Sequence, residues 1–84
     1  MDTRIRAELA DFIAANYLFG DTASIPRDDD SLVEQGVIDS TGILELIMFL
    51  EEKFAIKVAD EEMVPTNLDS VQNVVAFIER KKAA

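Results

Sequence analysis

Residues 36–54 read GVIDSTGILELIMFLEEKF, and this stretch decides the expected fold. After Asp39, apolar residues recur at the spacing of one helical face: Ile43, Leu46, Ile47, Leu50 and Phe54. An Asp before such a run is a favoured N-cap, because its carboxylate accepts a backbone N–H of the first turn. The pattern therefore predicts a helix over residues 40–54 with one face in a core.

Similar apolar spacing predicts two more main helices, over residues 3–18 and 70–82. The acidic run Asp60-Glu61-Glu62 is expected to open a short helical segment that carries Met63 and Val64, before Pro65. Residues 20–39 form a long connection between the first two main helices. The expected fold class is therefore all-α, in one domain over residues 1–84. It is a small bundle of three main helices plus one short helix.

We expect the long connection to be ordered by apolar anchors. Ser31 and Glu34 fit a capping box around one short helical turn. This turn would pin four apolar residues to the core: Leu32, Val33, Val37 and Ile38. Three residues at the end of the first helix are expected to pack beneath the connection: Tyr17, Leu18 and Phe19.

The composition argues against several classes of function. The net charge is −9, and the chain contains neither histidine nor cysteine. Without these side chains an independent acid–base enzyme or a metal site is disfavoured, and we expect neither. The acidic net charge disfavours binding to nucleic acid. The one basic cluster, residues 80–82, is explained by the dipole at the end of a helix. No apolar run is long enough to insert in a membrane, and no signal segment is visible, so we expect a cytoplasmic location.

Two Asp-Ser pairs precede helical patterns, and they differ in their surroundings. After Asp69-Ser70, Gln72 could complete a capping box with Asp69 as N-cap, so folding alone explains this pair. After Asp39-Ser40, Gly42 is a poor helix former, costing about 1 kcal/mol relative to Ala. Small residues there would leave Ser40 accessible to a visiting enzyme, and a helix N-terminus favours an attached anion. On the residues alone, modification of Ser40 and an ordinary helix start both remain open.

Ser40 is a poor candidate for a catalytic nucleophile. No histidine is present to activate it, and Ile38 stands where the G-x-S-x-G elbow requires its first glycine. On a helical wheel, Glu45, Met48 and Glu52 form one line opposite the apolar face. This line is either a docking strip for a partner or a solvated acidic face with one exposed Met.

The sequence strongly resembles the acyl carrier protein family, which includes peptidyl and aminoacyl carriers. The resemblance rests on GVIDS at residues 36–40, ELIMFLEEKF at 45–54, IKVADEE at 56–62 and LDSV at 68–71. It implies a four-helix carrier fold with 4'-phosphopantetheine on the Ser40 hydroxyl, flanked by the motif residue Asp39. A phosphopantetheinyl transferase would install this arm from coenzyme A, and the cargo would be a thioester on its terminal thiol.

The resemblance also implies a docking helix for ligases or synthases with basic patches. The expected docking residues are Thr41, Leu44, Glu45, Met48, Glu51 and Glu52. Thr41, Gly42, Phe49 and Lys53 depart from the family's usual residues, so partner identity is open. Our hypothesis is a stand-alone, monomeric carrier of an aminoacyl or secondary-metabolite acyl group, rather than the fatty-acid carrier. The alternative is an unmodified acidic interaction module with a carrier-like fold.

Overall fold

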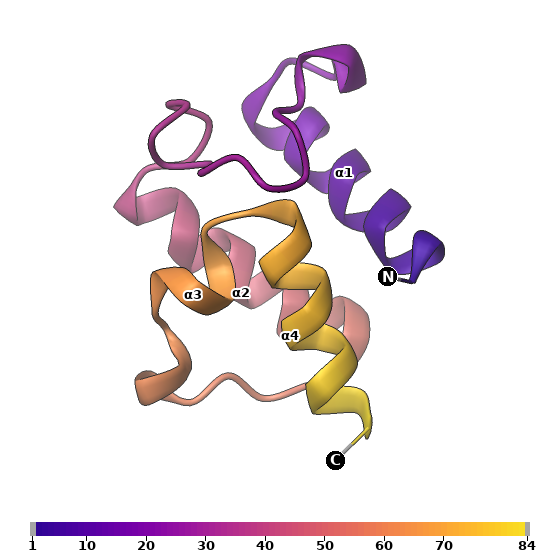
Figure 1. Ribbon diagram of the computed structural model, residues 1–84, viewed down its shortest axis with the longest axis vertical. Helices are drawn as coiled ribbons and strands as arrows, with labels where there is room; N and C mark the ends of the chain where they lie inside the picture. Colours follow the sequence, from indigo (N-terminus) through magenta and orange to yellow (C-terminus); the bar gives the residue numbers. More distant parts are fainter. Residues whose placement is uncertain (1, 84) are drawn as a thin grey trace.

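The helix α2 (Ser40–Phe54) begins and ends where its apolar pattern predicts. The computed structural model describes residues 2–83, which form four α-helices and two short 3-10 turns and contain no strand (Figure 1). The other elements are α1 (Thr3–Tyr17), η1 (Thr22–Ser24), η2 (Asp60–Glu62), α3 (Pro65–Leu68) and α4 (Val71–Ala83). The predicted all-α fold is confirmed. No helix within residues 2–83 combines the length and apolarity needed to cross a membrane.

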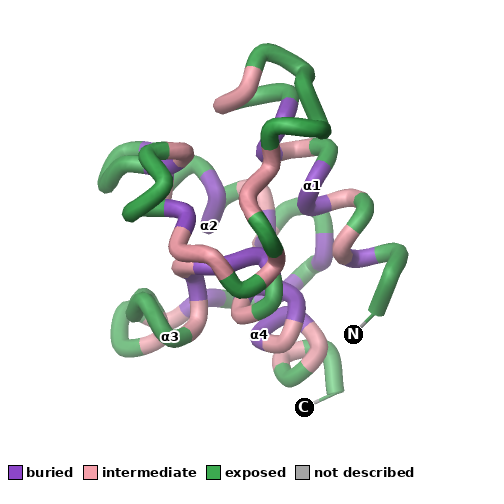
Figure 2. Tube along the Cα trace, turned by 45° about the horizontal axis from the view of Figure 1, so that its top comes forward, coloured by how far each residue is buried: buried purple, intermediate pink, exposed green. Residues whose placement is uncertain are grey.

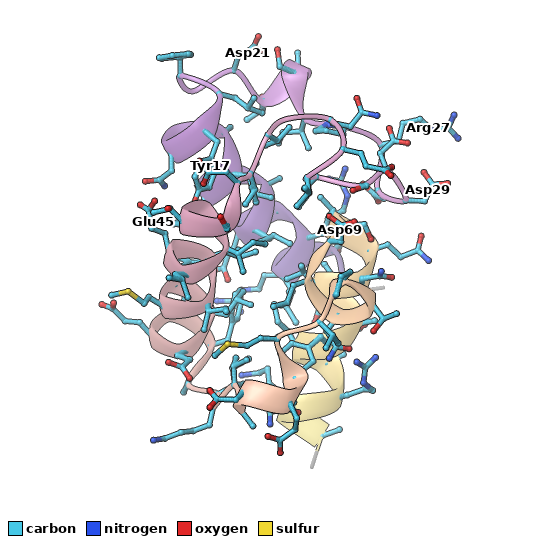
Figure 3. All side chains as sticks on the ribbon, turned by 90° about the vertical axis from the view of Figure 1, so that its left-hand side faces the viewer. Tyr17, Asp21, Arg27, Asp29, Glu45 and Asp69 are labelled. Carbon is cyan, nitrogen blue, oxygen red and sulfur yellow. The ribbon has the colours of Figure 1, made fainter. Side chains whose placement is uncertain are left out.

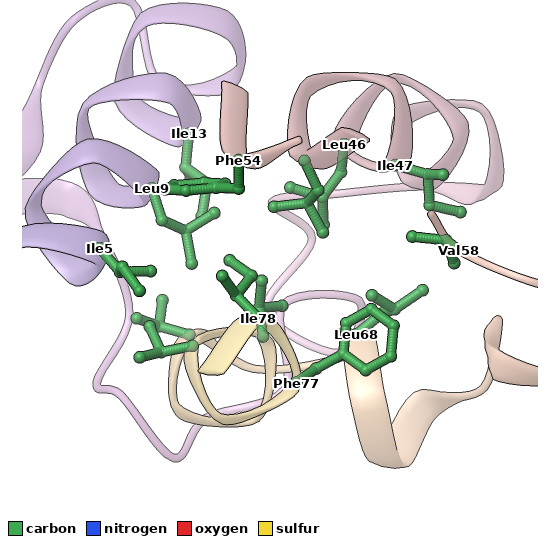
Figure 4. Packing of buried hydrophobic residues seen from close by; sticks show 14 of the residues in the cluster. Ile5, Leu9, Ile13, Leu46, Ile47, Phe54, Val58, Leu68, Phe77 and Ile78 are labelled. Atoms are coloured by element: carbon green, nitrogen blue, oxygen red, sulfur yellow. The ribbon is translucent and has the colours of Figure 1, made fainter. Parts of the chain in front are cut away.

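Each main helix contributes one buried stripe to a shared core (Figure 2). Leu9 and Ile13 of α1 meet Phe54 of α2, while Phe77 and Ile78 come from α4 (Figure 4). Burying a side chain of this size stabilises the fold by about 1.5–3 kcal/mol. The core therefore holds the three main helices together, and α4 packs against both α1 and α3.

Local hydrogen bonds fix where the helices begin. The carboxylate of Asp2 accepts the backbone N–H groups of Arg4 and Ile5 and so caps α1. At α4 the cap is Ser70, whose Oγ accepts the N–H of Asn73 at 3.1 Å. The capping box of Asp69 with Gln72 does not form, because the carboxylate of Asp69 binds the long connection instead. The pair still serves folding, with Ser70 as the cap.

The short helix lies later than predicted. Residues 60–62 form only a 3-10 turn, and the helical segment α3 starts at Pro65. The residue before a proline is pushed toward extended backbone, and Val64 has φ −126° and ψ 154°. A helix through residues 60–64 is therefore ruled out, whereas Pro65 suits the first position of a new one.

Two packing predictions are wrong, for Val33 in the long connection and for Phe19 at the end of α1. Leu32 and Ile38 are buried as expected, but the Val33 side chain is 51% exposed. The turn points Leu32 inward, and its successor therefore faces solvent. Phe19 is fully exposed, and its φ of 55° lies in the left-handed region where helix α1 ends.

The long connection is tied to α1 and α4 by two acidic residues. Asp28 accepts hydrogen bonds from the Arg6 guanidinium, with Nη2 to Oδ1 at 2.8 Å, and its carbonyl accepts the N–H of Gln72. These hydrogen bonds from Arg6 are the main reason that the pKa of Asp28 lies below its ordinary value. Asp28 therefore links the connection to both helices.

Asp69 makes the second attachment of the connection. Its Oδ2 accepts the Ser31 hydroxyl at 2.6 Å, and its Oδ1 accepts the Val33 N–H at 3.2 Å. Its backbone carbonyl accepts the Leu32 N–H at 2.6 Å. Three donors from consecutive residues of the connection thus converge on one residue next to α4.

We predict that Asp69→Ala lowers the free energy of unfolding by about 1–3 kcal/mol, because two donors of the connection lose their acceptor. Urea denaturation followed by circular dichroism measures this change. The matched control is Asp29→Ala, because Asp29 makes only an exposed ion pair with Arg27 at 3.8 Å. The control should stay within about 0.5 kcal/mol of wild type, and an equal loss in both variants would refute the anchoring role of Asp69.

Candidate functional site

Ser40 is the first residue of α2 and is exposed to solvent. Asp39 precedes it in extended backbone, and its Oδ1 accepts the N–H of Gly42 at 2.7 Å. Ile38, which is 2% exposed, fixes the chain to the core just before this cap. The hydroxyl of Ser40 is thus offered to solvent on a turn whose backbone is held on both sides.

Ser70 has the opposite surroundings. It is 5% exposed, and its Oγ accepts the N–H of Asn73 in the first turn of α4. A partner enzyme cannot reach this hydroxyl without unfolding the start of α4. Ser40 is therefore the accessible member of the two Asp-Ser pairs.

Gly42 occupies a tightly packed position, which differs from the reason suggested by the sequence. Gly42 is buried, and a Cβ there would lie 3.1 Å from Cγ2 of Ile38 and 3.3 Å from Cε1 of Tyr17. The hydroxyl of Tyr17 also donates to the Gly42 carbonyl at 3.0 Å. Gly42 therefore lets Tyr17 approach the backbone of α2. It does not expose that backbone to a partner enzyme, as the sequence suggested.

Sequence reasoning assigned Tyr17 only to packing and missed its polar contact with α2. Tyr17 lies beside Glu45 at the start of α2 (Figure 3). Burial raises the pKa of Tyr17 above its ordinary value, with smaller contributions from the charges of Glu45 and Asp39. The hydroxyl therefore stays protonated as a donor. Because the two residues are 25 positions apart, no local sequence signal indicates this contact.

Five of the six predicted docking residues lie on one exposed surface of α2. We call this surface the α2 face, and it consists of Thr41, Leu44, Glu45, Met48 and Glu52. The sixth, Glu51, is half-buried, and its Oε2 accepts the N–H of Val58 at 2.9 Å. Leu44 and Met48 are 57% and 68% exposed, so apolar and acidic groups alternate on this face.

An apolar groove of about 260 Å³ lies between the long connection, the first turns of α2, and α3. We call it the α3 groove, and its apolar walls are Val33, Ile43, Met63, Val64, Pro65 and Leu68. The polar side chains of Ser31 and Asp69 on its wall are hydrogen-bonded to each other. The groove is therefore suited to an apolar group. Residues 2–83 contain no cluster of side chains placed to hold a metal ion.

Residues 4–78 match the family model described as "Phosphopantetheine attachment site". A "Probable acyl carrier protein PigG" from a Serratia species is 29% identical over 79 residues, covering 94% of this chain and 90% of the relative. An "Acyl carrier protein" from Solidesulfovibrio magneticus is 34% identical over 76 residues, covering 90% and 94%. A "D-alanyl carrier protein" from Abiotrophia defectiva is 30% identical over 56 residues, covering 67% and 71%.

The chain belongs to the acyl carrier protein family. It is thus a carrier and not an enzyme, and its cofactor is 4'-phosphopantetheine, whose terminal thiol supplies the thioester chemistry that this cysteine-free chain lacks. Carriers of this family interact with phosphopantetheinyl transferases and with synthases or ligases. The start of α2 fits such a group, because an exposed hydroxyl stands at a helix N-terminus that favours a phosphate.

Proposed function

We propose that Ser40 carries the 4'-phosphopantetheine and that residues 1–84 act as one carrier domain. The observation that carries this proposal is the exposure of Ser40 at the capped start of α2, in contrast to the burial of Ser70. The transferase moves phosphopantetheine from coenzyme A to Oγ, which loses its proton, and adenosine bisphosphate leaves. Because coenzyme A is an intracellular metabolite, a cytoplasmic location fits the proposal.

The electrostatics of the helix start suit a phosphodiester on Ser40. The free N–H groups and dipole of α2 stabilise a nearby anion by roughly 0.3–1 kcal/mol. Asp39 opposes this, but its Oδ1 accepts the Gly42 N–H at 2.7 Å, which draws some of its charge toward the helix. The helix N-terminus and Asp39 therefore act in opposite directions on an anion attached to Ser40.

We predict one added phosphopantetheine when the full chain is incubated with coenzyme A and a broad-specificity transferase. Intact mass spectrometry should show this gain in wild type and in Ser70→Ala, and no gain in Ser40→Ala. Circular dichroism confirms that both variants fold. The alternative of an unmodified interaction module predicts no mass gain from a transferase that modifies a known carrier in the same assay, and that result would overturn the proposal.

We further propose that the α2 face docks on basic patches of partner enzymes. The chain has a net charge of −9, and Glu45 and Glu52 flank the exposed Met48 on one side of α2. Opposite charges raise the rate of encounter, and a central apolar contact slows dissociation. The transferase and the acyl- or aminoacyl-activating enzymes would thus meet the same acidic surface next to Ser40.

We predict that Glu45→Lys lowers kcat/KM for modification of Ser40 by about tenfold at low ionic strength, because a steering charge is reversed. The loss should shrink as salt is added, since exposed charges are screened. Stopped-time mass spectrometry measures both effects. The matched control is Glu61→Lys, which makes the same charge change at an exposed position on η2. If the two variants lose the same activity, net charge rather than the α2 face governs docking.

We also propose that the cargo is an aminoacyl or short acyl group rather than a long fatty acyl chain. One relative is named as a D-alanyl carrier protein, and the relative PigG is named as a probable acyl carrier protein. Leu46 and Leu50 are fully buried. The mostly apolar α3 groove has about 260 Å³, and a second, more polar hollow of about 490 Å³ borders Asp39 and Thr41. Because the apolar hollow is the smaller of the two, we favour a compact group over a long chain.

We predict that the holo chain is loaded at least roughly tenfold faster by amino-acid-activating ligases than by fatty-acid synthase enzymes, a discrimination equal to about 1.4 kcal/mol. Intact mass after timed incubation measures loading. A fatty-acid carrier loaded by the same synthase enzymes serves as the positive control. Efficient loading by the fatty-acid enzymes alone would rule out this cargo class while leaving the arm on Ser40 in place.

A further inference from the structure

We propose that Tyr17 is a positioning residue for the modification of Ser40, because it clamps the first turn of α2 to the end of α1. This inference rests on the proposed attachment at Ser40. It assigns to α1, which carries none of the expected site residues, a direct part in presenting the hydroxyl.

The peptide groups of Gly42 are held from both sides. Its N–H donates to Asp39 Oδ1 at 2.7 Å, and its carbonyl accepts the hydroxyl of Tyr17 at 3.0 Å. Ser40 lies between Asp39 and Gly42, so its backbone belongs to the segment that these two hydrogen bonds span. The clamp therefore restricts the backbone of Ser40, from which Oγ projects.

The ring of Tyr17 is itself fixed by neighbouring aromatic side chains. Phe12 meets Tyr17 edge-on, with ring centroids 5.9 Å apart, and stacks on Phe49 of α2 at 4.0 Å. Phe49 in turn meets Phe54 at 5.9 Å. This row of rings joins α1 to α2 along their length, so the Tyr17 hydroxyl is carried on a rigid support.

The glycine at position 42 leaves room for the Tyr17 ring. A side chain at position 42 would meet the Tyr17 ring at 3.3 Å and the Ile38 methyl at 3.1 Å. The raised pKa of Tyr17 keeps its donor proton through the physiological range. The poor helix former Gly42 thus has a specific use, since it admits the tyrosine that holds its carbonyl.

Positioning matters because the transferase must bring Ser40 Oγ in line with a phosphorus atom. Reactions of this kind need the reacting atoms about 3–3.5 Å apart and aligned, and a shift of about 1 Å can cost a hundredfold in rate. A looser first turn would spread Oγ over more positions without changing the α2 face. The loss should therefore fall on kcat and not on KM for the carrier.

Tyr17→Phe tests the clamp, because it removes the hydroxyl and keeps the ring. We expect kcat of a phosphopantetheinyl transferase to fall roughly two- to tenfold, the factor for one net hydrogen bond, with an unchanged KM for the carrier. Amide hydrogen exchange at Gly42 and Ile43 should become faster by a similar factor. The control is Val74→Ala, which removes two buried methyl groups from α4, a helix that contributes no residue to the clamp.

Val74→Ala should lower the melting temperature at least as much as Tyr17→Phe and yet keep kcat. An unchanged kcat in Tyr17→Phe, or an equal loss of kcat in Val74→Ala, would overturn the clamp. No mass gain in the wild-type chain would instead overturn the proposed attachment at Ser40. The two failures are thus distinguishable, and amide exchange reports on the hydrogen bond in either case.

Discussion

The position of the candidate site depends on the hydrogen bonds that Asp69 makes to the long connection. Apart from Leu32 and Ile38, this connection places few side chains in the core, so apolar burial alone holds it weakly. The carboxylate and carbonyl of Asp69 bind three of its donors, next to the buried Leu32. Only a few residues separate this attachment point from Ser40. The path of the chain toward Ser40 is therefore fixed by contacts next to α4 as well as by the start of α2.

The two Asp-Ser pairs differ in the hydrogen bonds that their aspartates make. Asp39 caps its own helix and leaves the next hydroxyl exposed, whereas Asp69 turns away from its helix and leaves the cap to Ser70. The same dipeptide behaves differently because Asp69 faces the donors of Ser31 and Val33 across the bundle. At Asp39 the nearest unsatisfied donors are those of its own helix.

Local patterns predicted most of the helical fold, and contacts between distant segments account for what they missed. The stripe from Ile43 to Phe54 and its Asp cap identified α2, because both signals lie within the helix itself. The start of α3 was misplaced because the extended residue before Pro65 outweighed the helical charge pattern. The exposure of Phe19 depends on the turn that closes α1, which the apolar pattern does not encode.

In the candidate site, too, local patterns predicted the exposed residues, and contacts between distant segments could not be predicted. The exposure of Glu45, Met48 and Glu52 follows from helical geometry, and their line on the wheel predicted it. The contact between Tyr17 and Gly42 joins residues 25 positions apart, so no local pattern reports it. Glu51 also follows the wheel, yet its carboxylate bends back to the N–H of Val58 beyond the end of α2.

The three basic residues in the last turn of α4 lie at the end of the bundle away from Ser40. Lys81 bonds to Glu62, Arg80 bonds to Asn67, and Lys82 reaches the carbonyl of Phe54 at the far end of α2. Fifteen residues of helix place that end about 22 Å from Ser40, more than two Debye lengths at physiological salt. These cations therefore stabilise the closing turns of the bundle and lie beyond the screening distance from the exposed Ser40 hydroxyl.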